Sequence, residues 1–205
     1  FVGNKVASIA ANLAGDPVQL SERAVAMAKV SPENPFASLA DAEQLAQAVV
    51  DLDLIDNTSL SMDQMIEYAV ECEAAALSVD GVTKSNGASY SFSQGATVLA
   101  TSTGFQGNYS ASRFSASVSV VAGDGLKMER DYDFDSQHHL ADLRSLSEIG
   151  ERAGKRAAKR VSPRQVPSQS TTVIFDPRIA KSLVGHLASA VNGASIARKT
   201  SFLRD

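Results

Sequence analysis

The protein has 205 residues, of which 44% are hydrophobic and 20% are charged, a balance typical of a soluble globular domain and not of a disordered or fibrous chain. Nineteen Lys and Arg residues against 23 Asp and Glu residues give a net charge of -4, which argues against a generally basic nucleic-acid-binding protein. No apolar run reaches the roughly 18 residues that a membrane span needs, and a single cysteine excludes a disulfide framework.

The two ends of the chain lack the usual start and stop signals. The sequence begins at Phe1 without an initiator methionine, and it ends at Asp205 without a nearby glycine or proline. We therefore expect a piece of a longer protein, cut at both ends. Because one lone cysteine fits a reducing compartment, we also expect the protein in the cytoplasm.

The first part of the chain predicts one strand and two helices. Residues 4–12 alternate loosely, which favours a strand. Asp16 followed by Pro17 has the pattern of a helix cap with proline at the first helical position, and predicts a helix over residues 16–29. A short helix is expected over residues 41–50.

The clearest helix covers residues 61–78. Ser61 and Gln64 have the spacing of a capping box, in which each side chain accepts a hydrogen bond from the other residue's backbone N–H. Apolar side chains recur at helical spacing and mark a buried face, which consists of Met65, Ala69, Cys72 and Ala76.

The middle of the chain changes to the two-residue period of strands. Residues 89–92 alternate, Gln94-Gly95 is expected to turn, and residues 96–103 form the return strand. The strongest strand covers residues 114–122, with one apolar face and one hydroxyl face. After a turn at Gly123-Asp124-Gly125, the period continues through Leu126, Met128, Tyr132 and Phe134. Four strands joined by short turns predict an antiparallel meander, and together with the helices an α+β fold.

Helical signals return after the meander. Ser145 and Glu148 predict a second capping box, which opens a helix over residues 145–161. Further along, residues 171–175 predict a short buried strand. A last helix is expected from Asp176-Pro177 to Val191, ended by Asn192-Gly193.

These elements predict two domains. We expect an N-terminal α+β domain over residues 1–161, incomplete at its start. Residues 162–170 are rich in proline and serine and predict a linker. Residues 171–205 would then be the beginning of a truncated C-terminal domain.

Three aspartates resemble part of a calcium-binding loop. Asp131, Asp133 and Asp135 alternate and are followed by Asp142, close to the spacing of the oxygen ligands in such loops. Ser136, however, stands where the sharp turn needs glycine, and Asp142 stands where glutamate is usual. A charged strand end is therefore the favoured interpretation.

The histidines are weak candidates for chemistry. His138 and His139 lie near aspartates, but adjacent side chains diverge by about 100° on a helix and about 180° on a strand, so both rarely reach one metal ion. A solvated loop is favoured. His186 falls on or beside the apolar stripe of the last predicted helix, where a lone histidine more often packs than catalyses.

A basic cluster and the cysteine also favour structural interpretations. The cluster lacks an aromatic platform, which favours a solvated helix face or a domain contact over a nucleic-acid site; it consists of Lys155, Arg156, Lys159, Arg160 and Arg164. Cys72 on an apolar helix face favours core packing. Gly104 and Gly107 suit a turn better than a phosphate cradle. No nucleophile elbow, phosphate-binding loop or dinucleotide fingerprint occurs, so we assign no catalytic, metal or cofactor-binding residue and leave peptide-binding residues open.

A series of short segments carries a family resemblance. They are residues 101–105 (TSTGF), 113–120 (RFSASVSV), 128–133 (MERDYD), 175–177 (FDP), 182–187 (SLVGHL) and 201–203 (SFL). In this order and spacing the chain resembles the TldD/PmbA family, in particular its PmbA (TldE) branch. The resemblance extends over essentially the whole chain. It implies that most of a C-terminal domain and a short N-terminal stretch lie outside this sequence.

The resemblance also implies a function. The family is associated with a cytoplasmic metalloprotease complex that acts on small or unfolded peptides, in peptide maturation and in degradation of an antitoxin. Its TldD-type subunit holds zinc through a His-Glu-x-x-x-His motif on a helix. Anchored on Gly193, the motif's positions fall here at Val184, Gly185 and Ser189, which cannot supply that chemistry. We therefore expect zinc in a partner subunit and none on this chain.

The leading hypothesis is thus a non-catalytic subunit of a heteromeric metallopeptidase, which helps to enclose or present extended peptides. The serine-rich face of residues 111–122 is a candidate surface for strand addition by a peptide. We expect a TldD-like subunit or a second copy as partner, and neither nucleic acid nor membrane. Two alternatives stay open: an autonomous metallopeptidase with ligands in the missing C-terminal half, and a homodimeric peptide-binding scaffold.

Overall fold

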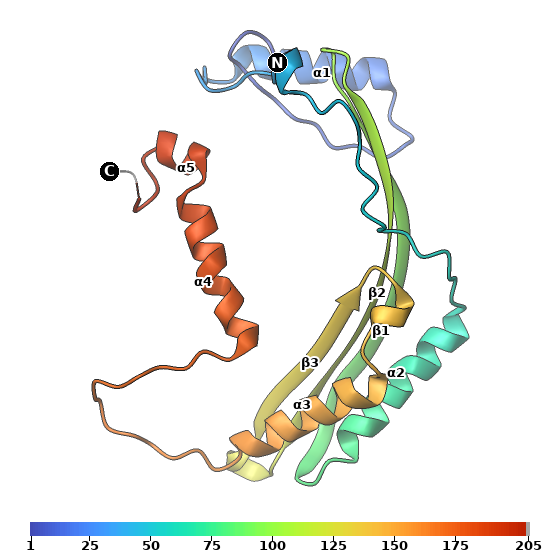
Figure 1. The fold of residues 1–205 in the computed structure, drawn as a ribbon, viewed down its shortest axis with the longest axis vertical. Coiled ribbons are helices and arrows are strands. Elements are labelled where there is room, and N and C mark those ends of the chain that lie inside the picture. Colours follow the sequence, from blue (N-terminus) through green and yellow to red (C-terminus); the bar gives the residue numbers. More distant parts are fainter. Residues whose placement is uncertain (204–205) are drawn as a thin grey trace. The chain divides into compact units, whose positions relative to one another are not determined.

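The computed structural model describes residues 1–203. The chain forms two compact units, Phe1–Ser162 and Pro163–Asp205. The first unit contains the sheet and the helices that cover it, and the described part of the second contains the helices α4 and α5 (Figure 1).

The sheet is an antiparallel meander in the order β1-β2-β3. β1 covers Val82–Ala100, β2 covers Gln106–Ala122 and β3 covers Glu129–Gln137. A loop with one 3-10 turn, η2 (Gly125–Lys127), joins β2 to β3. The predicted α+β class with an antiparallel meander is confirmed, but the described sheet has three strands and not the expected four.

The expected turn at Gln94-Gly95 is wrong. β1 continues through these residues, and its pairing with β2 runs without a shift from Gly87 opposite Ser119 to the end of the strand. Continuous pairing with the long neighbouring strand overrides the local turn preference of one glycine. The chain instead reverses after β1 at residues 101–105, where Gly104 adopts a φ of 94° that favours glycine.

Two helices lie side by side on one face of the sheet (Figure 1). α2 spans Met62–Leu77 and α3 spans Leu146–Arg160, which confirms both predicted helices. At the start of α2 the predicted capping box of Ser61 and Gln64 is complete. At the start of α3 only half of the expected box forms: Ser145 accepts the N–H of Glu148, while the Glu148 carboxylate pairs with arginines instead.

The core between helices and sheet is built from small side chains. Its fully buried members come from α2, β2 and α3, and they are Cys72, Ala76, Ala116, Val118, Val120, Ala122, Ile149, Ala153 and Ala157. The glycines of α3 allow the helices to approach closely. A Cβ on Gly150 would overlap the carbonyl oxygen of Cys72, and one on Gly154 would lie 2.7 Å from Cγ2 of Val79. The helical period in the sequence therefore identified the buried face of α2 correctly, although the close approach of the two helices was not foreseen.

The N-terminal segment is less regular than predicted. α1 spans Pro17–Val30, and Asp16 caps it as expected. Residues 4–12 form no strand, because no neighbouring strand of the described chain pairs with them; one isolated bridge joins Val2 and Lys5. The helix expected over residues 41–50 is reduced to a 3-10 turn, η1 (Ala42–Gln44), and the chain beyond it is extended.

The second unit contains α4 (Pro177–Ala190) and α5 (Gly193–Ala197). α4 is capped by Asp176 and ends just before Asn192-Gly193, as predicted. The strand expected over residues 171–175 is wrong, since a strand needs a partner and residues 163–203 contain none.

We predict that Gly150→Ala destabilises the first unit. The added methyl group would collide with the backbone of α2, and overpacking of this kind costs about 2 kcal/mol after the gain in helix propensity is subtracted. Urea unfolding measures the change. Gly185→Ala in α4 is the matched control, because nothing lies within 4 Å of its added Cβ; it should leave stability unchanged or raise it slightly. Equal stability of the two variants would contradict the prediction.

Candidate functional site

The two faces of β3 carry opposite kinds of side chain. Asp131 and Asp133 face the helices and are 5% and 3% exposed, although they are carboxylates. Tyr132 and Phe134 face away from the helices and are about half exposed. The two-residue period was therefore predicted correctly, but in β3 the acids and not the aromatics occupy the buried side.

Arginines from α3 and from the residue just before it neutralise these acids. Asp133 accepts hydrogen bonds from Arg144 at 2.9 Å and from Arg156 at 2.7 Å, and the Arg152 guanidinium lies 3.6 Å away. Asp131 pairs with Arg160 at 3.4 Å. Burial alone would make such charges very unfavourable, so the arginines are required for the aspartates to lie there.

The same pattern extends to Asp135. Burial opposes ionisation of this carboxyl, but the backbone N–H groups of Arg144 and Ser136 and the Arg144 guanidinium hold its pKa below the usual range. Two of the calcium-like acids, Asp133 and Asp131, thus pair with Arg156 and Arg160 of the basic cluster. The solvated-face interpretation is wrong for Arg156, whose side chain is only 20% exposed. Within residues 1–203 no three His, Cys, Asp or Glu side chains gather in a way that could hold a metal ion.

We predict that Asp133→Asn lowers the free energy of unfolding by about 3 kcal/mol, because it leaves several arginine charges partly buried without their carboxylate. Glu148→Gln is the matched control; it removes only exposed pairs and should cost less than about 1 kcal/mol. Chemical denaturation at neutral pH measures both. A loss for Asp133→Asn no larger than that of the control would contradict the structural importance of this network.

Residues 49–56, which we call the strap, lie extended beside β2 beyond the point where β3 ends. The last β2–β3 pair is Phe114 with Gln137, and further along β2 the N–H of Ser112 donates to the Leu54 carbonyl at 2.9 Å. Ser112 also accepts the N–H of Asp56 through its hydroxyl at 2.8 Å. The strap therefore follows an edge of β2 that β3 leaves open.

The adjacent histidines make different contacts: His139 bonds the strap, and His138 bonds β2 at the residue to which the strap is attached. Nδ1 of His138 bonds the Ser112 carbonyl at 2.8 Å, and Nε2 of His139 bonds the Asp53 carbonyl at 2.7 Å. Both side chains are half-buried, so the expected solvated loop is wrong. The divergence of neighbouring side chains was anticipated correctly. Ser112 and Asp56 were missed, because nothing local in the sequence signals contacts over such long separations.

This cluster is not arranged for nucleophilic catalysis. The Ser112 hydroxyl donates to the backbone carbonyl of His138 at 2.7 Å and not to an imidazole nitrogen. A serine nucleophile needs an adjacent base that can take its proton. Asp56 likewise accepts the N–H of Leu140, at the start of the 3-10 turn η3 (Leu140–Asp142), and serves as an anchor.

The strap contacts should depend on pH in two directions. The Asp53 carbonyl raises the pKa of His139, helped by nearby carboxylates against partial burial. Backbone and side-chain hydrogen bonds from Leu140 and Thr58 lower the pKa of Asp56. The stability that His139 gives the strap contacts is thus complete below the ordinary histidine pKa near 6.5 and is lost as pH rises through the raised pKa. The stability that Asp56 gives them is lost as pH falls below about 4.

We therefore predict that amide exchange at Asp56 and Leu140, corrected for intrinsic rates, is slowest at mildly acidic pH. In His139→Ala the corrected exchange rate should no longer rise as pH increases above this minimum, while its rise at lower pH should be unchanged. His186→Ala is the control, since His186 is exposed on α4. Retention of the alkaline limb in His139→Ala would contradict the assignment.

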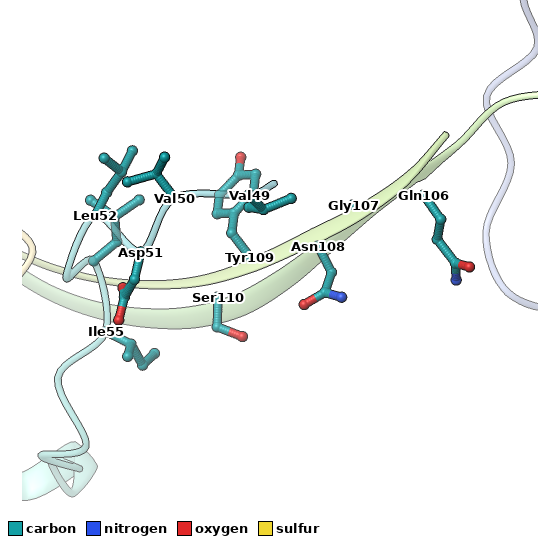
Figure 2. A pocket seen from close by; sticks show the side chains of 11 residues that line it. Val49, Val50, Asp51, Leu52, Ile55, Gln106, Gly107, Asn108, Tyr109 and Ser110 are labelled. Atoms are coloured by element: carbon teal, nitrogen blue, oxygen red, sulfur yellow. The ribbon is translucent and has the colours of Figure 1, made fainter. Parts of the chain in front are cut away.

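A groove of about 430 Å³ lies between the strap and β2 (Figure 2). We call it the strap groove. Apolar side chains of Val49, Val50 and Leu52 line it with Tyr109, and β2 adds the polar Asn108 and Ser110. No strand of the described chain pairs with β2 on this side between residues 106 and 111. An open strand edge beside apolar side chains can accept an extended peptide through backbone hydrogen bonds.

The burial and contacts of the remaining candidate residues from the sequence decide their role. Cys72 is fully buried, and burial, helped by the charge of Glu71, raises the pKa of its thiol to about 11. A thiol with so high a pKa is not a nucleophile at neutral pH, so Cys72 is a core residue. Gly107 lies against Val49 of the strap. In α4, Val184, Gly185, His186 and Ser189 are all exposed, so His186 does not pack as expected.

Comparison with known proteins gives the family. The model of the PmbA/TldA metallopeptidase central domain matches residues 55–161, and that of the PmbA/TldA metallopeptidase C-terminal domain matches residues 168–205. The chain belongs to the PmbA/TldD family. The arginine–aspartate network and the β2 side of the strap groove fall within the central-domain match, most of the strap precedes it, and α4 falls within the C-terminal match.

Similar proteins include metalloprotease PmbA of Escherichia coli O157:H7, 35% identical over 90% of this chain, and its homologue in Haemophilus influenzae, 34% identical over the same share. The chain spans only 41% of the length of either relative. A crystal structure from Bacteroides thetaiotaomicron, provisionally described as a modulator of DNA gyrase, superposes with a TM-score of 0.86 at 25% identity, over 99% of this chain and 48% of its own.

A TldE structure from Thermococcus kodakarensis has the same fold, with a TM-score of 0.51 at 20% identity, over 68% of this chain and 31% of its own. The chain is therefore a metallopeptidase-related protein of the PmbA/TldD family. None of the helices within residues 1–203 is long and apolar enough to cross a membrane.

Proposed function

We propose that this chain is part of a non-catalytic, TldE-like subunit of a cytoplasmic metallopeptidase complex, which holds extended peptides while a TldD-like partner supplies zinc. Membership of the PmbA/TldD family supports the general assignment. The amino-acid composition of α4 is the observation that supports the non-catalytic assignment.

Anchored on Gly193, the family resemblance places the positions of the His-Glu-x-x-x-His motif at Val184, Gly185 and Ser189 of α4. Valine has no donor atom, glycine has no side chain, and serine is a poor ligand for zinc. These residues therefore do not fit a zinc ion. The contribution of this chain to peptide cleavage would then be binding and positioning.

The strap groove is the better candidate for peptide binding than the serine-rich face. On that face, the Ser117 hydroxyl bonds Ser89 at 2.9 Å and the Ser115 hydroxyl bonds Ser136 at 2.7 Å, so these side chains already bond one another. Their strand is also central in the sheet there, with β1 on one side and β3 on the other. Strand addition needs an open edge, and β2 offers one only along the strap groove.

We predict that the full-length protein cleaves an unstructured peptide only when it is mixed with a zinc-bearing TldD-like partner. In that mixture, Leu52→Asp should raise KM about tenfold with little change in kcat, because it removes apolar contact worth ~1.4 kcal/mol from the groove. Leu126→Asp is the matched control, since Leu126 is fully exposed at a distant turn. Peptidase activity of this protein alone, with stoichiometric zinc, would refute the non-catalytic role.

The two alternatives give different results in the same experiments. An autonomous metallopeptidase with ligands outside residues 1–205 would contain stoichiometric zinc by metal analysis of the purified full-length protein. A homodimeric scaffold would self-associate in sedimentation experiments and would gain no activity from a zinc-bearing partner.

A further inference from the structure

The outward face of α2 carries an exposed apolar row. Met62, Ile66 and Val70 repeat every four residues and are 67%, 53% and 58% exposed. Leu77 extends the same side and is 43% exposed. The core side of the helix, with Cys72 and Ala76, lies only about 90° away around the helix axis, so this row extends the apolar side of α2 beyond its buried part. Helices of single domains usually present polar side chains to water on such a face.

An acidic row runs beside the apolar one. Asp63, Glu67 and Glu71 each follow one member of the apolar row, and they repeat with the same period. α2 contains no lysine or arginine, and none of the ion pairs among residues 1–203 involves these three carboxylates. Glu67 and Glu71 are like charges four residues apart, which destabilises a helix slightly, whereas Asp63 in the first turn is favoured by the helix dipole.

A groove adjoins the apolar row where α2 faces β1. It has a volume of about 370 Å³ and is lined on one side by Met62, Met65 and Ile66, and on the other by residues 88–92 of β1. Flexible methionine side chains adapt to differently shaped apolar groups. The groove is large enough to take one long apolar side chain from a molecule that lies along α2.

We propose that the outward face of α2 docks an amphipathic helix of a partner protein, with a basic row beside its apolar stripe. The four-residue repeat of both rows matches the ridges that helices use when they pack against each other. Complementarity with the acidic row selects lysine and arginine on the partner. This surface is separate from the strap groove, and the inference goes beyond peptide holding.

The test uses full-length protein and two synthetic helical peptides of about 18 residues, long enough to form a marginal helix. Both carry leucine every fourth residue; one carries lysine and the other glutamate at the following positions. We expect the lysine peptide to bind at least tenfold more tightly than the glutamate peptide by fluorescence anisotropy at physiological salt. The double variant Ile66→Ser, Val70→Ser should weaken its binding at least tenfold.

A charge exchange distinguishes this site from general attraction to an acidic protein. Glu67→Lys with Glu71→Lys should reverse the preference, so that the glutamate peptide binds more tightly. The matched control, Glu22→Lys on the exposed surface of α1, should leave the preference unchanged. Circular dichroism confirms that each variant is folded. Equal binding of the two peptides, or binding that survives both double variants, would overturn the proposal.

Discussion

Burial of negative charge between β3 and α3 is the constraint on which the rest of the first unit depends. Asp131 and Asp133 occupy positions in the sheet that would ordinarily hold apolar side chains, and they face α3. They can lie there only because arginines reach them from α3 and from Arg144 at its start. Arginine suits this role because its planar guanidinium donates several hydrogen bonds at once and stays charged. The network therefore fixes the placement of α3 along β3.

The side of α3 that faces α2 carries no charged side chains and instead approaches α2 through glycines. Gly150 and Gly154 bring its backbone close to α2, while the small core residues leave little space between the helices and the sheet. A polar contact on one side and a backbone approach on the other together define the position of the helix. Substitution of a single glycine or arginine in this region therefore changes the packing of α3 on both of its sides.

The regular part of the sheet leaves one end of β2 without a strand partner on the β3 side. β3 is shorter than β2, and the strap occupies only part of the edge that becomes free. Hydrogen bonds of Ser112 and His139 hold the strap, and the strap groove lies beside it. A loop positioned by a rigid sheet is the usual place for recognition in a folded protein.

Local patterns in the sequence predicted what depends on local physics. Helix caps such as Asp16 and Ser61, and the apolar period of the longer helices, act over a few residues, so the helices and their buried faces were recognised. The tertiary structure alone decided which elements pair. Pairing with β2 converted an expected turn at Gln94-Gly95 into continuous strand. It also joined Asp131 and Asp133 to arginines that lie more than ten residues away, and His139 to a strap residue 86 positions earlier. Such contacts form only when the folded backbone brings distant residues together, and no local pattern encodes their partners.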